Sequence, residues 1–187
     1  MGQQPPPPVH QQPPDQQPSP PLARLAAATA ALSVPLALLD LRMMRTGGPG
    51  IIPFELAGPE RSPRILRKWG RDGRRAARAS LLLDFPYLTA YTLLGVRLTR
   101  RAQGAMAARG RRSLSSFGGT VALAQVGAGA CDAVENAALL GVLQRGGKER
   151  LATVARTAAL AKFARLAAGW AYGVAAMLMA RRGRPSG

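Results

Sequence analysis

Long apolar runs alternate with short basic stretches along most of the 187-residue chain. Runs of about 20 apolar residues, folded as helices with a rise of 1.5 Å per residue, cross the roughly 30 Å hydrocarbon core of a bilayer. Four such runs predict helices at about residues 22–44, 79–98, 117–143 and 151–180. The pattern therefore predicts an all-α fold, a four-helix transmembrane bundle over residues 22–182.

The longest connection between these helices, residues 51–78, is strongly basic. Within it Ile65, Leu66 and Trp69 recur at helical spacing among arginines. This pattern is typical of a short amphipathic helix at the lipid headgroups, with Trp69 as an interfacial anchor. The alternative interpretation is a solvated basic loop.

The two ends of the chain differ from the apolar part in composition. Residues 1–21 are nearly all proline and glutamine and hold no aromatic side chain, which predicts a disordered or polyproline-like tail. Residues 183–187 form a short C-terminal tail in the same prediction. A proline-rich ligand for a partner domain is the alternative interpretation of the N-terminal segment.

A formal net charge of +17, from 26 Lys and Arg against 9 Asp and Glu, is typical of two classes of protein. A nucleic-acid-binding protein uses such charge on phosphates, and a membrane protein places it in short loops beside anionic headgroups. The basic residues here lie between apolar runs, which favours the membrane. The predicted partner is the lipid bilayer, with anionic lipids at the basic loops, and no nucleic acid is expected. The alternative is a soluble, basic, helical nucleic-acid-binding protein, although aromatic residues for base stacking make up only 5%.

Sequence motifs for catalysis or cofactor binding are missing. The chain has no HExxH, no GxSxG and no glycine-rich phosphate loop. Its single cysteine, Cys131, and single histidine, His10, allow neither an internal disulfide nor a Cys/His metal cluster. We therefore predict no cofactor and no metal, and the sequence leans against enzymatic activity but does not decide it.

Ionisable residues inside the apolar runs fall at one depth of the predicted bundle. Residues equidistant from the connection between two antiparallel helices lie at similar depth. This holds for Asp132 and Lys162, for Asp84 and Asp132, and for Asp40 and Asp84. Such side chains face the interior of a bundle, because lipid does not solvate them. The candidate polar layer comprises Asp84, Asp132, Glu135, Asn136, Lys162 and Arg165.

Three functions are compatible with this polar layer. The favoured one is structural: Asp132 or Glu135 pairs with Lys162 or Arg165 and locks the last two helices together. The second is a small transporter or proton or ion path that uses Asp84, Asp132, Glu135 and Lys162. The third is a membrane pocket for a lipid-like ligand, lined by the carboxylates, Tyr87 and Tyr91.

Five segments resemble a family of small bacterial four-helix integral membrane proteins of unknown function. They are IIPFELAGPE, ILRKWG, ASLLLDFPYLTAYT, CDAVENAALL and LAKFARLAAGWAYG, in this order between Leu38 and Tyr172. The positions that match the family pattern are Glu55, Trp69, Ser80, Asp84, Tyr91, Asp132, Glu135, Asn136 and Lys162. The chain departs from the pattern at Pro86 and in its arginine-rich first connection. The resemblance implies no activity, but it adds Glu55 to the candidate layer if the first connection folds back onto the bundle.

The abundance of arginine and alanine is typical of a bacterium with a GC-rich genome. The predicted location is therefore the bacterial plasma membrane, crossed several times by the chain. Basic residues are spread over connections on both sides, so the positive-inside rule does not fix the orientation.

Overall fold

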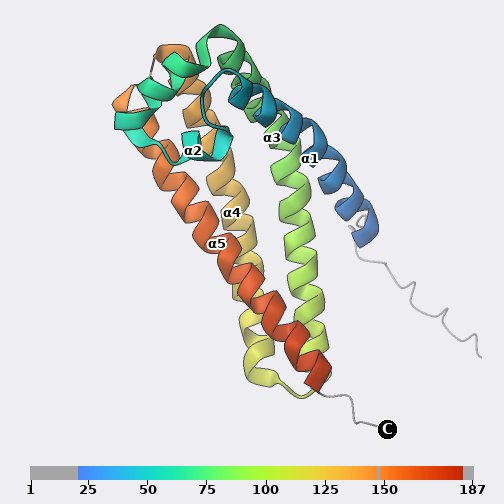
Figure 1. The fold of residues 1–187 in the computed structure, drawn as a ribbon. Coiled ribbons are helices and arrows are strands. Elements are labelled where there is room, and N and C mark those ends of the chain that lie inside the picture. Colours follow the sequence, from blue (N-terminus) through green and yellow to red (C-terminus); the bar gives the residue numbers. More distant parts are fainter. Residues whose placement is uncertain (1–20, 147, 183–187) are drawn as a thin grey trace, which may run out of the picture.

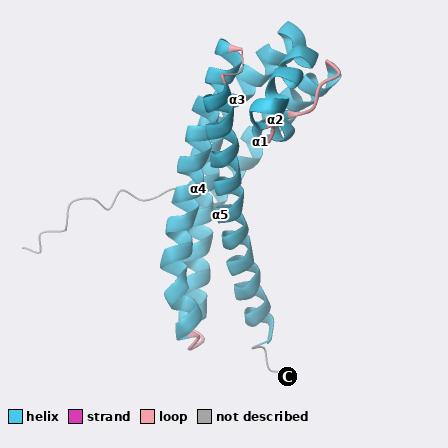
Figure 2. Cartoon of the chain, turned by 90° about the vertical axis from the view of Figure 1, so that its left-hand side faces the viewer, coloured by secondary structure: helices cyan, strands magenta, loops and turns pink. Residues whose placement is uncertain are grey.

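The chain folds into five α-helices in a computed structural model that describes residues 21–146 and 148–182. The helices are α1 (Leu22–Arg45), α2 (Ile51–Glu55), α3 (Gly58–Ala107), α4 (Arg112–Arg145) and α5 (Glu149–Arg182) (Figure 1). No strand occurs among the described residues, for which the predicted all-α fold is confirmed (Figure 2). The two predicted tails lie outside the described residues, apart from Pro21.

Most of the basic connection at 51–78 is helical. It contains α2 and the first part of α3, and α3 bends at Gly70, which has a φ of 57°. Glycine adopts this left-handed conformation without a steric penalty. Beyond the bend, Arg74 Nε donates a hydrogen bond to the carbonyl oxygen of Leu66 at 3.0 Å. The second predicted helix, 79–98, is therefore part of a longer one that ends at Ala107.

Trp69 shows why this connection folds. Its side chain is 1% exposed, its ring centroid lies 4.7 Å from that of Phe54, and its Nε1 donates to the Pro49 carbonyl oxygen at 2.8 Å. The expectation that Trp69 anchors the chain at the headgroups is wrong, because the indole is inside the protein. The amphipathic pattern itself is real, since the basic side chains beside it are exposed: Arg64, Arg67, Lys68 and Arg71.

The long helices differ in how they pack. Helices α3, α4 and α5 contact one another, whereas α1 packs mainly on α3 and runs obliquely to it (Figure 1). The first part of α3 and the α4–α5 connection lie at the same end of the molecule (Figure 1). The main apolar core lies at this end and includes Met43, Phe54, Leu66, Trp69, Leu139, Val142 and Ala155.

Three helices, α1, α3 and α4, are long and apolar enough to cross a membrane, judged on length and composition. The search covered the described residues, and α5 is not among the three. Three basic residues, Arg156, Lys162 and Arg165, interrupt the first half of α5. Length and composition alone therefore do not identify the predicted fourth span, 151–180, as a membrane helix.

Replacing Trp69 with alanine tests the core at this end. We expect Trp69→Ala to lower the free energy of unfolding by about 3–5 kcal/mol, because it empties a buried indole site and removes a hydrogen bond. Trp170→Ala is the matched control, because Trp170 is 74% exposed. It should cost about 1 kcal/mol or less. Denaturant unfolding in detergent measures both, and equal losses would contradict the burial of Trp69.

Candidate functional site

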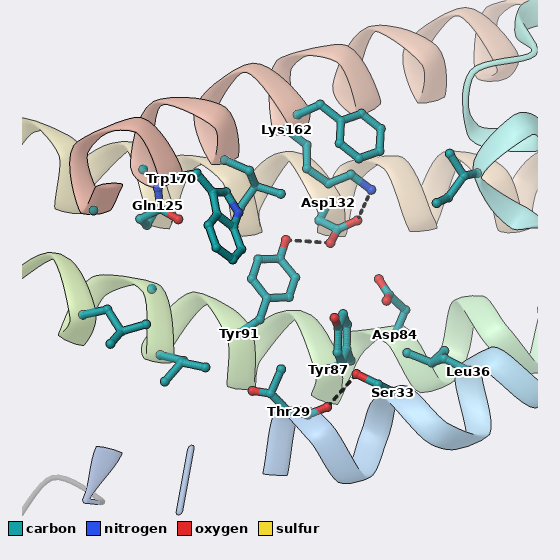
Figure 3. Close-up of a pocket in the computed structure, with 18 of the residues that line it drawn as sticks. Thr29, Ser33, Leu36, Asp84, Tyr87, Tyr91, Gln125, Asp132, Lys162 and Trp170 are labelled. Atoms are coloured by element: carbon teal, nitrogen blue, oxygen red, sulfur yellow. Dashed lines mark hydrogen bonds and ion pairs between the residues drawn. The ribbon is translucent and has the colours of Figure 1, made fainter. Parts of the chain in front are cut away.

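Lys162 lies at the centre of a buried cluster of carboxylates. Its Nζ is 2.8 Å from Glu135 Oε2, 2.9 Å from Asp132 Oδ1 and 3.3 Å from Glu55 Oε2. All four residues are buried. The contact with Asp132 is drawn in Figure 3. One ammonium group of α5 thus contacts carboxylates from α4 and from α2.

Helical geometry places the α4 members of the cluster. Asp132, Glu135 and Asn136 occupy positions i, i+3 and i+4, which share one face of a helix. All three are buried, and this face of α4 is turned toward the neighbouring helices. The spacing of the DAVEN segment is therefore what brings two carboxylates and an amide into the interior.

Glu55 reaches the cluster because α2 is held against the bundle. Phe54 is buried in the apolar core next to it, and Asp40 Oδ1 accepts a hydrogen bond of 2.6 Å from Ile51 N at the start of α2. Accepting from an otherwise unpaired N–H at a helix start is the usual role of an N-terminal cap. Asp40, which the sequence placed at the depth of the layer, thus positions α2 and makes no ion pair with Lys162.

Helix α3 joins the cluster through two hydrogen bonds to α4. Tyr91 OH donates to Asp132 Oδ2 at 2.7 Å, and Asn136 Nδ2 donates to Asp84 Oδ2 at 2.7 Å. Figure 3 shows Tyr91 and Lys162 on opposite sides of Asp132. Asp132 therefore uses one oxygen for α3 and the other for α5, and it links the three helices.

The charges of the cluster do not balance. Four carboxylates, those of Glu55, Asp84, Asp132 and Glu135, surround one ammonium group. Glu135 is fully buried, and neither of its oxygens accepts a hydrogen bond from the described residues, although Oε2 lies at ion-pair distance from Lys162. Burying unpaired charge is costly, so this site requires additional protons or a bound cation.

A cavity of about 1140 Å³ opens beside the cluster. Its polar end is lined by Glu55, Asp84, Asp132 and Lys162, and Tyr87 and Tyr91 lie next to them. Figure 3 labels all of these residues except Glu55. The rest of its wall is mostly apolar and includes Leu94, Leu98, Leu166, Trp170, Val174 and Met177. This volume lies at the upper end of the range for small-molecule pockets.

The structure brings together most of the candidate layer. Glu55, Asp132, Glu135 and Lys162 are in direct contact, and Asp84 and Asn136 form the adjoining pair. Arg165 is separate from them. Its Nη1 donates to the Ala161 carbonyl oxygen at 2.9 Å, and it takes part in none of the ion pairs of the described residues.

Sequence reasoning missed the apolar part of the cavity. Its signal was nevertheless present, because Leu94 and Leu98 continue the spacing of Asp84, Tyr87 and Tyr91 along one face of α3. A polar stripe that becomes apolar farther along the same helix face predicts a site with two chemically different ends.

Comparison with protein-family models, curated proteins and solved structures finds no match for the chain. The resemblance to a family of small bacterial membrane proteins therefore stays a hypothesis.

Removing the ammonium group tests the cluster. Lys162→Met leaves buried carboxylates unpaired and should lower the free energy of unfolding by about 3–5 kcal/mol. The matched control is Arg165→Met on the same helix, which removes a positive charge but no ion pair and should cost about 1 kcal/mol or less. Unfolding in detergent compares the two, and similar losses would refute a special role for Lys162.

The coupling between Lys162 and Glu135 follows from the same geometry. Lys162→Met together with Glu135→Gln should be less destabilised than the sum of the single variants by about 1 kcal/mol or more, since the second change removes the carboxylate left unpaired by the first. The double-mutant cycle measures this difference. Strict additivity would mean that the contact does not contribute to stability.

Proposed function

We propose that the chain is a multi-pass protein of the bacterial plasma membrane in which α1, α3, α4 and α5 form a four-helix bundle. The distribution of side chains supports this, because four ionisable residues, Glu55, Asp132, Glu135 and Lys162, are buried while many large apolar side chains are exposed. The most exposed include Val34, Leu38, Phe117, Leu123, Trp170 and Met177. Water disfavours apolar surface on this scale, whereas lipid covers it without cost.

Helix α5 completes the bundle in this proposal. Its ammonium group on Lys162 is directed inward and paired, so it is not presented to lipid. Beyond it, Trp170, Val174 and Met177 are exposed apolar side chains suited to contact with lipid or with an apolar ligand. A polar face turned inward and an apolar face turned outward is the arrangement that a membrane helix with charged residues requires.

Within the membrane, we propose that the protein binds an organic cation at the acidic end of its cavity. The observation that carries this proposal is that three carboxylates, Glu55, Asp84 and Asp132, line this end together with one ammonium group. A fourth carboxylate, that of Glu135, is buried in contact with the same ammonium group. A positively charged ligand offsets the excess negative charge and gains hydrogen bonds to ionised acceptors, which are the stronger kind.

A purely structural role explains less of the site. The ion pairs of Lys162 do hold α2, α4 and α5 together. A lock between two helices, however, needs one carboxylate for one ammonium group, and each further buried acid costs stability. The surplus acids, and their position at a cavity, support ligand binding in addition to helix fastening.

The geometry favours an organic cation over a metal ion. Among the described residues, no group of three Asp, Glu, His or Cys side chains is arranged to hold a metal. The cavity is far larger than an ion, and two tyrosine rings, 5.5 Å apart between centroids, lie beside the carboxylates. Aromatic rings next to acids are typical of sites for ammonium groups.

A second candidate function is a proton path. Glu135 favours it, because its carboxyl group is fully buried and accepts no hydrogen bond from the described residues. Intramembrane carboxylates of this kind commonly take up and release protons in transporters. Proton uptake at Glu135 is compatible with cation binding, since both offset the same surplus of negative charge.

Extraction experiments test the membrane proposal. We expect the protein to stay in the membrane fraction in high salt and in alkaline carbonate and to dissolve in detergent, because its apolar helices are covered by lipid. A soluble basic protein bound to nucleic acid would be released by salt. Release by salt or carbonate alone would refute the proposal.

Asp84→Asn tests cation binding without breaking the ion pairs of Lys162. Asp84 lines the cavity, and an asparagine there still accepts a hydrogen bond from Asn136. We expect wild-type protein in nanodiscs to bind butylammonium better than butanol, and Asp84→Asn to weaken butylammonium about tenfold or more. Calorimetry or ligand-induced thermal stabilisation provides the measurement.

The matched control is Asp72→Asn, which removes an exposed acid outside the cavity. It should bind butylammonium as the wild type does. Wild-type binding of butylammonium no tighter than butanol, or equal losses in the two variants, would show that the acidic cavity is not a cation site.

A further inference from the structure

We infer that the ligand is a long-chain amphiphile, whose cationic head lies at the carboxylates and whose chain lies in the groove between α3 and α5. This inference rests on the proposed cation site and adds the chemical class of the remainder of the ligand. Its basis is the change in character along the cavity wall, from acidic at one end to apolar at the other.

Two helices carry this change in the same direction. On α3 the lining residues Asp84, Tyr87, Tyr91, Leu94 and Leu98 follow at spacings of three and four, so they form one stripe that begins polar and becomes apolar. A carboxyl group, two phenols and two aliphatic side chains therefore follow one another along a single face of α3. Beyond this stripe, Thr99 and Arg101 line the far end of the cavity.

Helix α5 repeats the order. Its lining stripe begins at Lys162 and continues through Leu166, Gly169 and Gly173 to Met177. Both helices run antiparallel to α4. Asp84 and Tyr91 of α3 contact Asn136 and Asp132 in turn. Lys162 and Arg165 of α5 contact Asp132 and Gln125 in turn. The polar ends of the two stripes thus lie level, and the apolar ends extend the same way.

Both stripes extend far from the polar end, and the α3 lining continues past Leu98 to Ala105. Leu98 lies 14 positions after Asp84, about 21 Å along a helix, and Met177 lies 15 positions after Lys162, about 22 Å. This distance exceeds half of the roughly 30 Å hydrocarbon core. An alkyl chain fits such a groove, whereas a compact cation would leave most of it unused.

Gly173 gives a direct way to test the groove. It lines the cavity, and a Cβ added there has no heavy atom within 4 Å, so a larger side chain begins in open space at the cavity wall. Gly119 on α4 has the same free space but does not line the cavity. Gly173→Phe and Gly119→Phe are therefore matched changes, and only the first fills the groove.

The experiment measures binding of butylammonium and dodecylammonium to full-length protein in nanodiscs of zwitterionic lipid. Partitioning of each amine into the bilayer is the same for every variant, so differences between variants report on the protein. We expect Gly173→Phe to weaken dodecylammonium about tenfold or more, the effect of withdrawing roughly two methylene groups from burial, and to leave butylammonium unchanged. Gly119→Phe should bind both amines as the wild type does.

The outcomes separate the two proposals. If Gly173→Phe binds dodecylammonium as the wild type does while Asp84→Asn loses both amines, the cation site stands and the amphiphile inference is refuted. If wild-type protein binds neither amine, both proposals fail. Leu98→Trp fills the same region from α3 and decides the question if Gly173→Phe does not fold.

Discussion

The ion pairs of one ammonium group determine how the helices fit together. Lys162 contacts carboxylates of α4 and α2, and Asp132 passes the link on to Tyr91 of α3. Charge inside a protein is tolerated only when it is paired, which leaves few ways to rotate α5 about its axis. The same contacts bring Glu55, and with it α2, onto the bundle. The cavity lies beside these contacts and is lined by residues of all five helices.

Depth along the helices was predictable from the sequence, whereas the choice of partner was not. Counting outward from the connections put Asp132 level with Lys162, and these residues contact each other. The same counting included Asp40, and helical spacing added Arg165, but neither residue forms an ion pair of the cluster. Asp40 instead caps α2, an element that the hydrophobic pattern did not reveal. Arg165 faces Gly127 of α4, where no acid is available.

In the basic connection, 51–78, the many arginines led to a wrong expectation for the position of Trp69. The helical spacing of Ile65, Leu66 and Trp69 among arginines indicated either an amphipathic helix at the headgroups or a solvated loop. In the folded chain the apolar members of that segment, Ile65, Leu66 and Trp69, are buried, and the arginines form its outer face. Burial of an indole contributes more to stability than exposed arginines contribute or cost, so the apolar spacing decides the structure. The bend at Gly70 is a change of backbone conformation, and the spacing of the apolar residues does not predict it.

The surplus of acid at the cavity links stability to function. A bundle selected for stability alone would pair Lys162 with one carboxylate and fill the remaining space with apolar side chains. Glu135, a fully buried acid that shares the single ammonium group of Lys162 with Asp132 and Glu55, departs from that arrangement. A cation that binds the folded protein offsets this cost and stabilises the fold by mass action. The unliganded bundle then carries the cost of the buried acids, and the free energy recovered on binding is what makes the acidic end of the cavity selective for positive charge.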